Sequence, residues 1–124
     1  MKPKIILDPH GRRMANIFTP EDFARLEAVA DVIWARDEPM PEDEIEKVRH
    51  DITAIITGYW RHGDVARFPR LAAVLEVSGG FPSPASLDYA ACFARSIRVL
   101  SCAPAFGPAV AEMGLGLALR RRRF

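Results

Sequence analysis

The sequence predicts an α/β fold with a parallel sheet, because short apolar runs recur along it and segments with helical spacing separate them. The five runs, rich in Ile, Val and Leu, are residues 5–7, 32–34, 54–56, 74–77 and 99–101. Near-continuous apolar runs of this length are typical of strands that are covered on both faces. Parallel neighbours need a crossover connection, which the intervening helices supply. We therefore predict a flavodoxin-like three-layer sandwich with a five-stranded parallel sheet and helices on both faces.

The first long helix has the clearest start signal. Thr19 offers a capping hydroxyl and Pro20 occupies the first helical position, while Phe23, Leu26 and Val29 form one apolar face. The other connectors are expected to be a helix that begins at Pro41, a single turn within 63–70, and a helix within 87–95.

The last predicted helix, residues 109–119, is apolar on every side, and Glu112 is its only charged residue. Surface helices carry one apolar stripe, whereas a helix that is apolar all round is buried on all sides. Gly114 and Gly116 weaken a helix, which close approach of another backbone would explain. We expect a partner to pack on the outer face of this helix.

Composition and charge limit the possible functions. The chain has 124 residues, 49% of them hydrophobic, which is the size of one domain. Its net charge is +1, but four positive charges lie in the run 120–123, and the remaining 13 basic and 16 acidic residues give −3. Nucleic-acid and membrane-surface proteins need a basic patch on the folded body, so neither partner is expected. Residues 120–124 are predicted to be a solvated basic tail.

Cysteine and histidine spacing predict no metal site. Cys92 and Cys102 form no CxxC pair, and His10, His50 and His62 fall in separate segments. We expect the thiols to be reduced and buried, and the histidines to lie in solvated loops or at helix ends. The sequence has neither a secretory signal nor an apolar stretch long enough to span a membrane, so a cytoplasmic location is predicted.

The best candidate for a ligand site is Ser78-Gly79-Gly80, which follows the fourth apolar run. Ligands of parallel sheets bind beyond the carboxyl ends of the strands, and such a turn can direct consecutive backbone N–H groups at an anion. A plain turn is the alternative interpretation. Gly114-Leu115-Gly116 lacks the third glycine of a dinucleotide fingerprint, because Leu119 stands at that position. No catalytic residue is assigned.

Several of these segments occur in the order found in one family. They are residues 5–8, 54–58, 71–80, 87–91, 97–100 and 110–113. The chain, from about residue 4 to residue 119, resembles the N-terminal substrate-binding domain of the D-isomer-specific 2-hydroxyacid dehydrogenases. The most specific matches are the Ser-Gly-Gly turn, the LDYAA segment at 87–91 and the VAE segment at 110–112.

This resemblance implies a function. In the family a Rossmann domain, which this sequence lacks, binds NAD(P) and supplies the catalytic Arg, Glu or Asp, and His. The resemblance implies that Ser78, Gly79 and Gly80 hold the carboxylate of a small 2-hydroxy or 2-keto acid. It implies that Tyr59 and Trp60 wall the substrate, and that Ala103 and Pro104 face the nicotinamide. We therefore expect a truncated substrate domain, inactive alone, that does not bind the cofactor by itself.

Three other classes of protein are alternatives. A response-regulator receiver needs an acidic pair after the first strand, an aspartate after the third and a lysine after the fifth, but this sequence has Asp8-Pro9, Thr57-Gly58 and Ser101-Cys102 there. A flavin-binding flavodoxin would need a Ser/Thr-rich phosphate loop in place of residues 9–13. The stronger alternative is a non-catalytic interaction module that pairs through residues 109–119. Self-association through that apolar helix is expected in either case, because a large apolar patch is rarely left in water.

Overall fold

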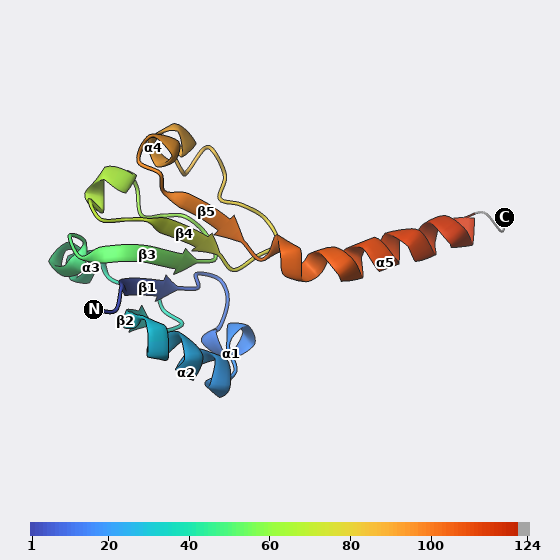
Figure 1. The fold of residues 1–124 in the computed structure, drawn as a ribbon, viewed down its shortest axis with the longest axis horizontal. Helices are drawn as coiled ribbons and strands as arrows, with labels where there is room; N and C mark the ends of the chain where they lie inside the picture. Colours follow the sequence, from blue (N-terminus) through green and yellow to red (C-terminus); the bar gives the residue numbers. More distant parts are fainter. Residues whose placement is uncertain (122–124) are drawn as a thin grey trace.

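The computed structural model describes residues 1–121, and within them it forms one five-stranded parallel sheet (Figure 1). The strands are β1 (Lys4–Asp8), β2 (Asp31–Ala35), β3 (Ile52–Thr57), β4 (Ala73–Glu76) and β5 (Arg98–Ser101). Their order across the sheet is β2-β1-β3-β4-β5, and every neighbouring pair is parallel. The predicted fold class and all five strands are confirmed.

The helices begin where local sequence signals place them. They are α1 (Met14–Ile17), α2 (Pro20–Val29), α3 (Glu42–Val48), the short 3-10 helix η1 (Val65–Arg67), α4 (Tyr89–Ala94) and α5 (Ala103–Arg121). The Thr19 hydroxyl accepts a hydrogen bond from the Asp22 amide at 3.1 Å, so the predicted cap of α2 is confirmed. The Asp88 carboxylate caps α4 in the same way, through the Ala91 amide at 3.0 Å.

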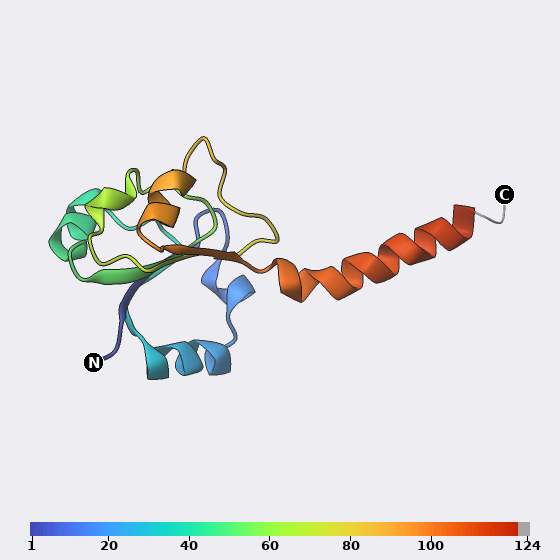
Figure 2. The same ribbon diagram turned by 45° about the horizontal axis from the view of Figure 1, so that its top comes forward.

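The two faces of the sheet are covered unequally. Helices α3 and α4 lie on one face, with α1 and α2 on the other (Figure 2). The main core lies on the first face, where Ile55 and Val74 of the sheet meet Ile45 of α3, Phe68 after η1 and Cys92 of α4. Helix α2 has no buried residue, and its Val29 is exposed although the apolar spacing predicted otherwise. The second face is covered over β1, where Ile5 and Leu7 are buried, and is less completely covered over β3, β4 and β5.

Helix α5 leaves the body of the protein. It begins at Ala103, six residues earlier than predicted, because Pro104 and Pro108 are both accommodated within the helix. It projects beyond the carboxyl ends of the strands (Figures 1 and 2), and none of its 19 residues is buried. Within residues 1–121 the rest of the chain buries no side of this helix, and the partner expected on its outer face stays a prediction. Arg120 and Arg121 form its last turn, and residues 122–124 of the predicted tail lie outside the described residues.

Within residues 1–121, none of the helices combines the length and the hydropathy that a membrane crossing requires.

Candidate functional site

The sequence-predicted site residues gather at one edge of the sheet. Because all five strands are parallel, their carboxyl ends lie together, and the segments that follow them meet there (Figure 1). Backbone hydrogen bonds join these segments: the Val77 amide donates to the Thr57 carbonyl at 3.0 Å, and the Cys102 amide donates to the Ser78 carbonyl at 2.9 Å. The turn after β4 is therefore fixed between the segments that follow β3 and β5.

The Ser78 side chain makes hydrogen bonds within the Ser78-Gly79-Gly80 turn and to the end of β4. The Ser78 hydroxyl donates to the Glu76 carboxylate and accepts a hydrogen bond from the Gly80 amide at 3.2 Å. The positive-φ glycines of the described residues are Gly11 and Gly63, so Gly79 and Gly80 do not use the left-handed conformation. A Cβ at Gly79 would lie 3.3 Å from the Phe106 ring, so this turn also supports the base of α5.

Tyr59 and Trp60 have opposite environments. Tyr59 is 52% exposed, and its ring centroid lies 5.6 Å from that of His10. Trp60 is only 1% exposed, and its indole N–H donates to the Gly63 carbonyl at 3.0 Å. Tyr59 thus offers a ring to the edge of the sheet, whereas Trp60 presents no surface to a ligand and supports the loop from within the core.

A buried charged cluster, which the sequence did not predict, lies beside this loop. The Asp8 side chain is fully buried at the end of β1, and the Arg61 guanidinium donates to its Oδ2. His62 Nε2 lies 3.9 Å from the same oxygen, and the residue is 1% exposed, so the expectation of a solvated histidine is wrong. Neither Asp8 Oδ1 nor His62 Nε2 has a hydrogen-bond partner among the described residues.

Burial determines the charge state of this histidine. It lowers the pKa of His62 from 6.5 to about 4, because the charged imidazolium is poorly solvated in the core. The Asp8 carboxylate opposes this shift, and Arg61 and Arg67 add to it. The ring is therefore neutral at pH 7.

The residues expected to face a nicotinamide form the first turn of α5. The Ala103 amide donates to the Ser101 hydroxyl at 3.2 Å, Ala103 is partly exposed, and Pro104 is exposed. Gly114 and Gly116 lie in the middle of the helix rather than at a strand-to-helix turn, where a dinucleotide phosphate binds. This glycine pair therefore does not form the phosphate-binding turn of a dinucleotide site.

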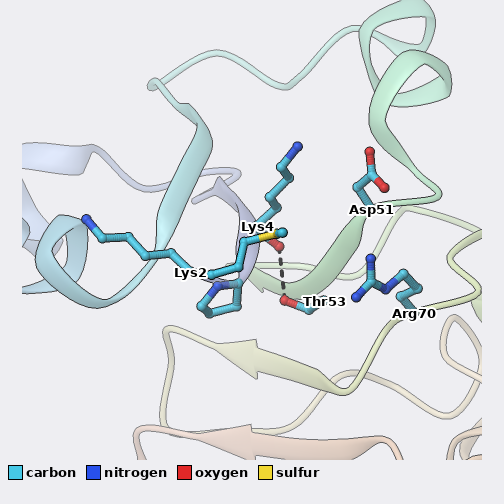
Figure 3. Close-up of a pocket in the computed structure, with 7 residues that line it drawn as sticks. Lys2, Lys4, Asp51, Thr53 and Arg70 are labelled. Atoms are coloured by element: carbon cyan, nitrogen blue, oxygen red, sulfur yellow. Dashed lines mark hydrogen bonds between the residues drawn. The ribbon is translucent and has the colours of Figure 1, made fainter.

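A basic pocket lies at the opposite edge of the sheet. Its volume is about 460 Å³, and it lies where β1 and β3 begin, between the N-terminus and Arg70. Figure 3 shows the side chains of Lys2 and Lys4 pointing in different directions, and Asp51, Thr53 and Arg70 also line the pocket. None of the predicted site residues lines it, so this pocket is separate from the candidate site.

An apolar groove lies on the sparsely covered face of the sheet. Its volume is about 650 Å³, and Ile56, Leu75 and Leu100 of the sheet form part of its wall. Leu26 of α2 and Phe106 of α5 also line it, as does Cys102. Cys102 is an exposed free thiol, contrary to the prediction that both cysteines are buried.

The strand order and the position of the site define a flavodoxin-like α/β domain. No protein-family model and no curated protein matches the sequence. Among solved structures, the chain is similar to a phosphoglycerate oxidoreductase from Rhizobium etli, with a TM-score of 0.67 and 25% identity over 95% of this chain and 36% of the other. It is also similar to a 2-hydroxyacid dehydrogenase from Ketogulonicigenium vulgare Y25, with a TM-score of 0.48 and 23% identity over 74% of this chain and 27% of the other.

The phosphoglycerate oxidoreductase confirms the resemblance that the sequence indicated. The chain is similar to part of that oxidoreductase: it spans about a third of the oxidoreductase's length and matches it over 95% of its own residues.

Proposed function

We propose that the chain is the substrate-binding domain of an NAD(P)-dependent 2-hydroxyacid dehydrogenase. Its role is to hold the carboxylate of a small 2-hydroxy or 2-keto acid, while a separate nucleotide-binding domain supplies the cofactor and the proton-transfer groups. The observation that carries the proposal is the position of the Ser78 turn, at the ligand-binding edge of a fold that aligns over 95% of the chain with an oxidoreductase.

The residues at this edge have different roles in binding the acid. The backbone amides of Ser78, Gly79 and Gly80 are the donors for the carboxylate, and the Gly80 amide would exchange its bond to the Ser78 hydroxyl for one to the ligand. Tyr59 forms the exposed wall of the site, and Trp60 positions that wall from beneath. Ala103 and Pro104 face the side from which a nicotinamide would approach.

Oxidation of a hydroxy acid requires removal of a hydride and a proton, and we assign neither step to this chain. The Gly114-Leu115-Gly116 segment lies within α5 and is not placed to bind the phosphates of the cofactor that accepts the hydride. The His62 imidazole is buried and does not face solvent, and the partly exposed His10, which lies beside Tyr59, is assigned no proton transfer. The chain therefore contributes the binding of the acid, and catalysis is expected only with a second domain.

Titration of the labelled protein with pyruvate, glyoxylate and hydroxypyruvate, followed by amide chemical shifts, tests carboxylate binding. We expect saturable shifts concentrated at residues 78–80. Ser78→Ala should weaken binding severalfold, because the hydroxyl that orders the turn is lost. Ser86→Ala is the matched control, since Ser86 lies in a separate turn and bonds to the Ser83 carbonyl. Shifts that never saturate, or that spare residues 78–80, would reject the proposed site.

Addition of NADH and of a nucleotide-binding domain tests whether the chain binds only the acid and depends on another domain for the cofactor. NADH alone should leave its fluorescence unchanged in the presence of the chain, and turnover should require the separately supplied domain. Turnover by the chain alone would overturn the proposal.

A second candidate function is a non-catalytic interaction module. The exposure of the whole of α5 favours it, because a soluble helix with this composition normally has a partner. Failure of a supplied nucleotide-binding domain to restore activity, together with tight self-association, would support the module over the substrate domain.

A further inference from the structure

The loop after β1 contains a residue with an unusual backbone, His10. Within residues 1–121, two residues other than glycine have a positive φ, His10 at 23° and Ser96 at 57°. Ser96 follows α4, where helices commonly end in this conformation, and its amide donates to the Phe93 carbonyl at 3.1 Å. His10 ends no helix, because it lies two residues after β1. Strained residues of this kind concentrate at ligand sites, which makes His10 a candidate for a role in binding.

The loop after β3 packs directly on the backbone of His10. A Cβ at Gly58 would lie 2.7 Å from the His10 carbonyl oxygen and 2.2 Å from that of Pro9, so only a glycine allows the two loops to approach. The loop after β3 is fixed in turn at its start. The Thr57 hydroxyl donates to the Tyr59 carbonyl at 2.7 Å and accepts a hydrogen bond from the Tyr59 amide at 3.2 Å. The two loops therefore hold each other in place.

This packing places two polar rings beside each other at the carboxyl edge of the sheet. The ring centroids of His10 and Tyr59 are 5.6 Å apart. Tyr59 is 52% exposed and His10 is partly exposed, so both rings are accessible from the edge. The hydrogen bonds of Tyr59 within residues 1–121 are made by its backbone, which leaves its hydroxyl available to a ligand. Together a phenol and an imidazole can both donate and accept hydrogen bonds.

The ring pair and the Ser78 turn flank the end of β3 from opposite sides. Strand β3 lies between β1 and β4, and neighbouring strands are about 4.8 Å apart, so the ends of β1 and β4 are separated by about 10 Å. The Val77 amide, bonded to the Thr57 carbonyl, keeps the turn beside β3. A three-carbon acid with a hydrogen bond of about 3 Å at each end spans a distance of this size. An acid held by its carboxylate at residues 78–80 can therefore reach the ring pair with its other end.

We propose that His10 is a specificity-determining residue of the acid site, and that with Tyr59 it binds a hydroxyl group on C3 of the substrate. This inference rests on the proposed function, because it takes the carboxylate to be held at residues 78–80. A polar pair loses hydrogen bonds when the ligand lacks the hydroxyl, whereas an apolar wall would not discriminate. The site therefore prefers hydroxypyruvate to pyruvate. Because Tyr59 is half exposed, water compensates part of the loss, and the preference should be roughly fivefold.

Amide chemical-shift titrations of the parent chain and of two glycine variants, with hydroxypyruvate and with pyruvate, test the proposal. His10→Gly removes the ring, and glycine suits the left-handed backbone, so the melting temperature should not fall. Its affinity for hydroxypyruvate should fall roughly fivefold, and that for pyruvate should change less than twofold. Ser96→Gly is the matched control, because it makes the same change at the other positive-φ position, after α4, and should keep the preference of the parent. Tyr59→Phe retains the ring and should lose part of the preference.

The outcomes separate this inference from the proposed function. If both acids shift the amides of residues 78–80 with equal affinity, or if His10→Gly keeps the preference, the role of His10 is refuted and carboxylate binding stands. If His10→Gly weakens both acids equally and melts at a lower temperature, His10 supports the loop and does not select the ligand, which also overturns the inference. If neither acid shifts residues 78–80 in the parent chain, the proposed function and this inference fail together.

Discussion

At the scale of single residues, His62 gives the protein a defined dependence on pH. The unfolded chain binds a proton on this ring below about pH 6.5, whereas the folded chain resists protonation until about pH 4. The free energy of unfolding should therefore fall as the pH falls through this window, by about 3 kcal/mol in total. Urea denaturation at pH 7, 5.5 and 4.5 measures it. His62→Leu should flatten the dependence, and His50→Leu, at an exposed position, should leave it unchanged.

The Asp8 and Arg61 pair leads to a second prediction at this scale. Arg61→Met removes the partner of a fully buried carboxylate, so unfolding should become easier by about 2 to 3 kcal/mol. Arg25→Met breaks an ion pair of which both side chains are more than half exposed, and it should cost less than about 0.5 kcal/mol. Equal effects of the two variants in chemical denaturation would show that Asp8 does not depend on Arg61.

These residues also show what the sequence could not reveal. Tyr59, Trp60 and His62 lie in a loop, where no helical or strand periodicity indicates which side chain points inward. Their environments are decided by tertiary contacts, such as the bond from the Trp60 indole to the Gly63 carbonyl and the packing of His62 against Phe68. The Ser78 turn could be located because it directly follows an apolar run, whereas its bond to Glu76 became visible only in the fold.

At the scale of elements, Gly58 holds the loops after β1 and β3 together. A Cβ at this position would lie 2.2 Å from the Pro9 carbonyl oxygen and 2.7 Å from that of His10. Since both atoms belong to backbone, they cannot move without displacing the β1 to α1 loop. Gly58→Ala should lower stability by at least about 2 kcal/mol. Gly80→Ala is the control, because its nearest atom would be Ser78 Oγ at 3.9 Å. A thermal melt of Gly58→Ala that matches the parent would contradict this packing.

The elements themselves could be predicted wherever their signals were local. The apolar runs fixed the five strands to within about two residues, and the Thr19 cap located the start of α2. The start of α5 was placed too late, because Pro104 and Pro108 suggest an interruption, although the helix accommodates both. Its direction depends on the contacts of Cys102 and Phe106 with the turn after β4, which no helical pattern encodes.

At the scale of the whole molecule, the two faces of the sheet are covered unequally. The main core forms between the sheet and the α3, η1 and α4 side, and no residue of α2 or α5 is buried. The face that carries α3, η1 and α4 therefore has a complete core. On the other face, the row of Ile56, Leu75 and Leu100 stays accessible to another chain. The same surfaces would serve an attached second domain or a second copy.

If two chains associate through α5, stability must depend on concentration. Association through residues 109–119 adds to the stability of the folded state by mass action, because the unfolded chain cannot form the interface. The melting temperature of the parent chain should therefore rise by several degrees between about 1 and 100 μM, which spans about 2.7 kcal/mol of linkage. Leu117→Glu should show a smaller rise over this range, since it retains the core and weakens only the contact made by α5. Calorimetry at the two concentrations measures the difference, and a parent chain whose melting temperature does not move would show that α5 remains in water.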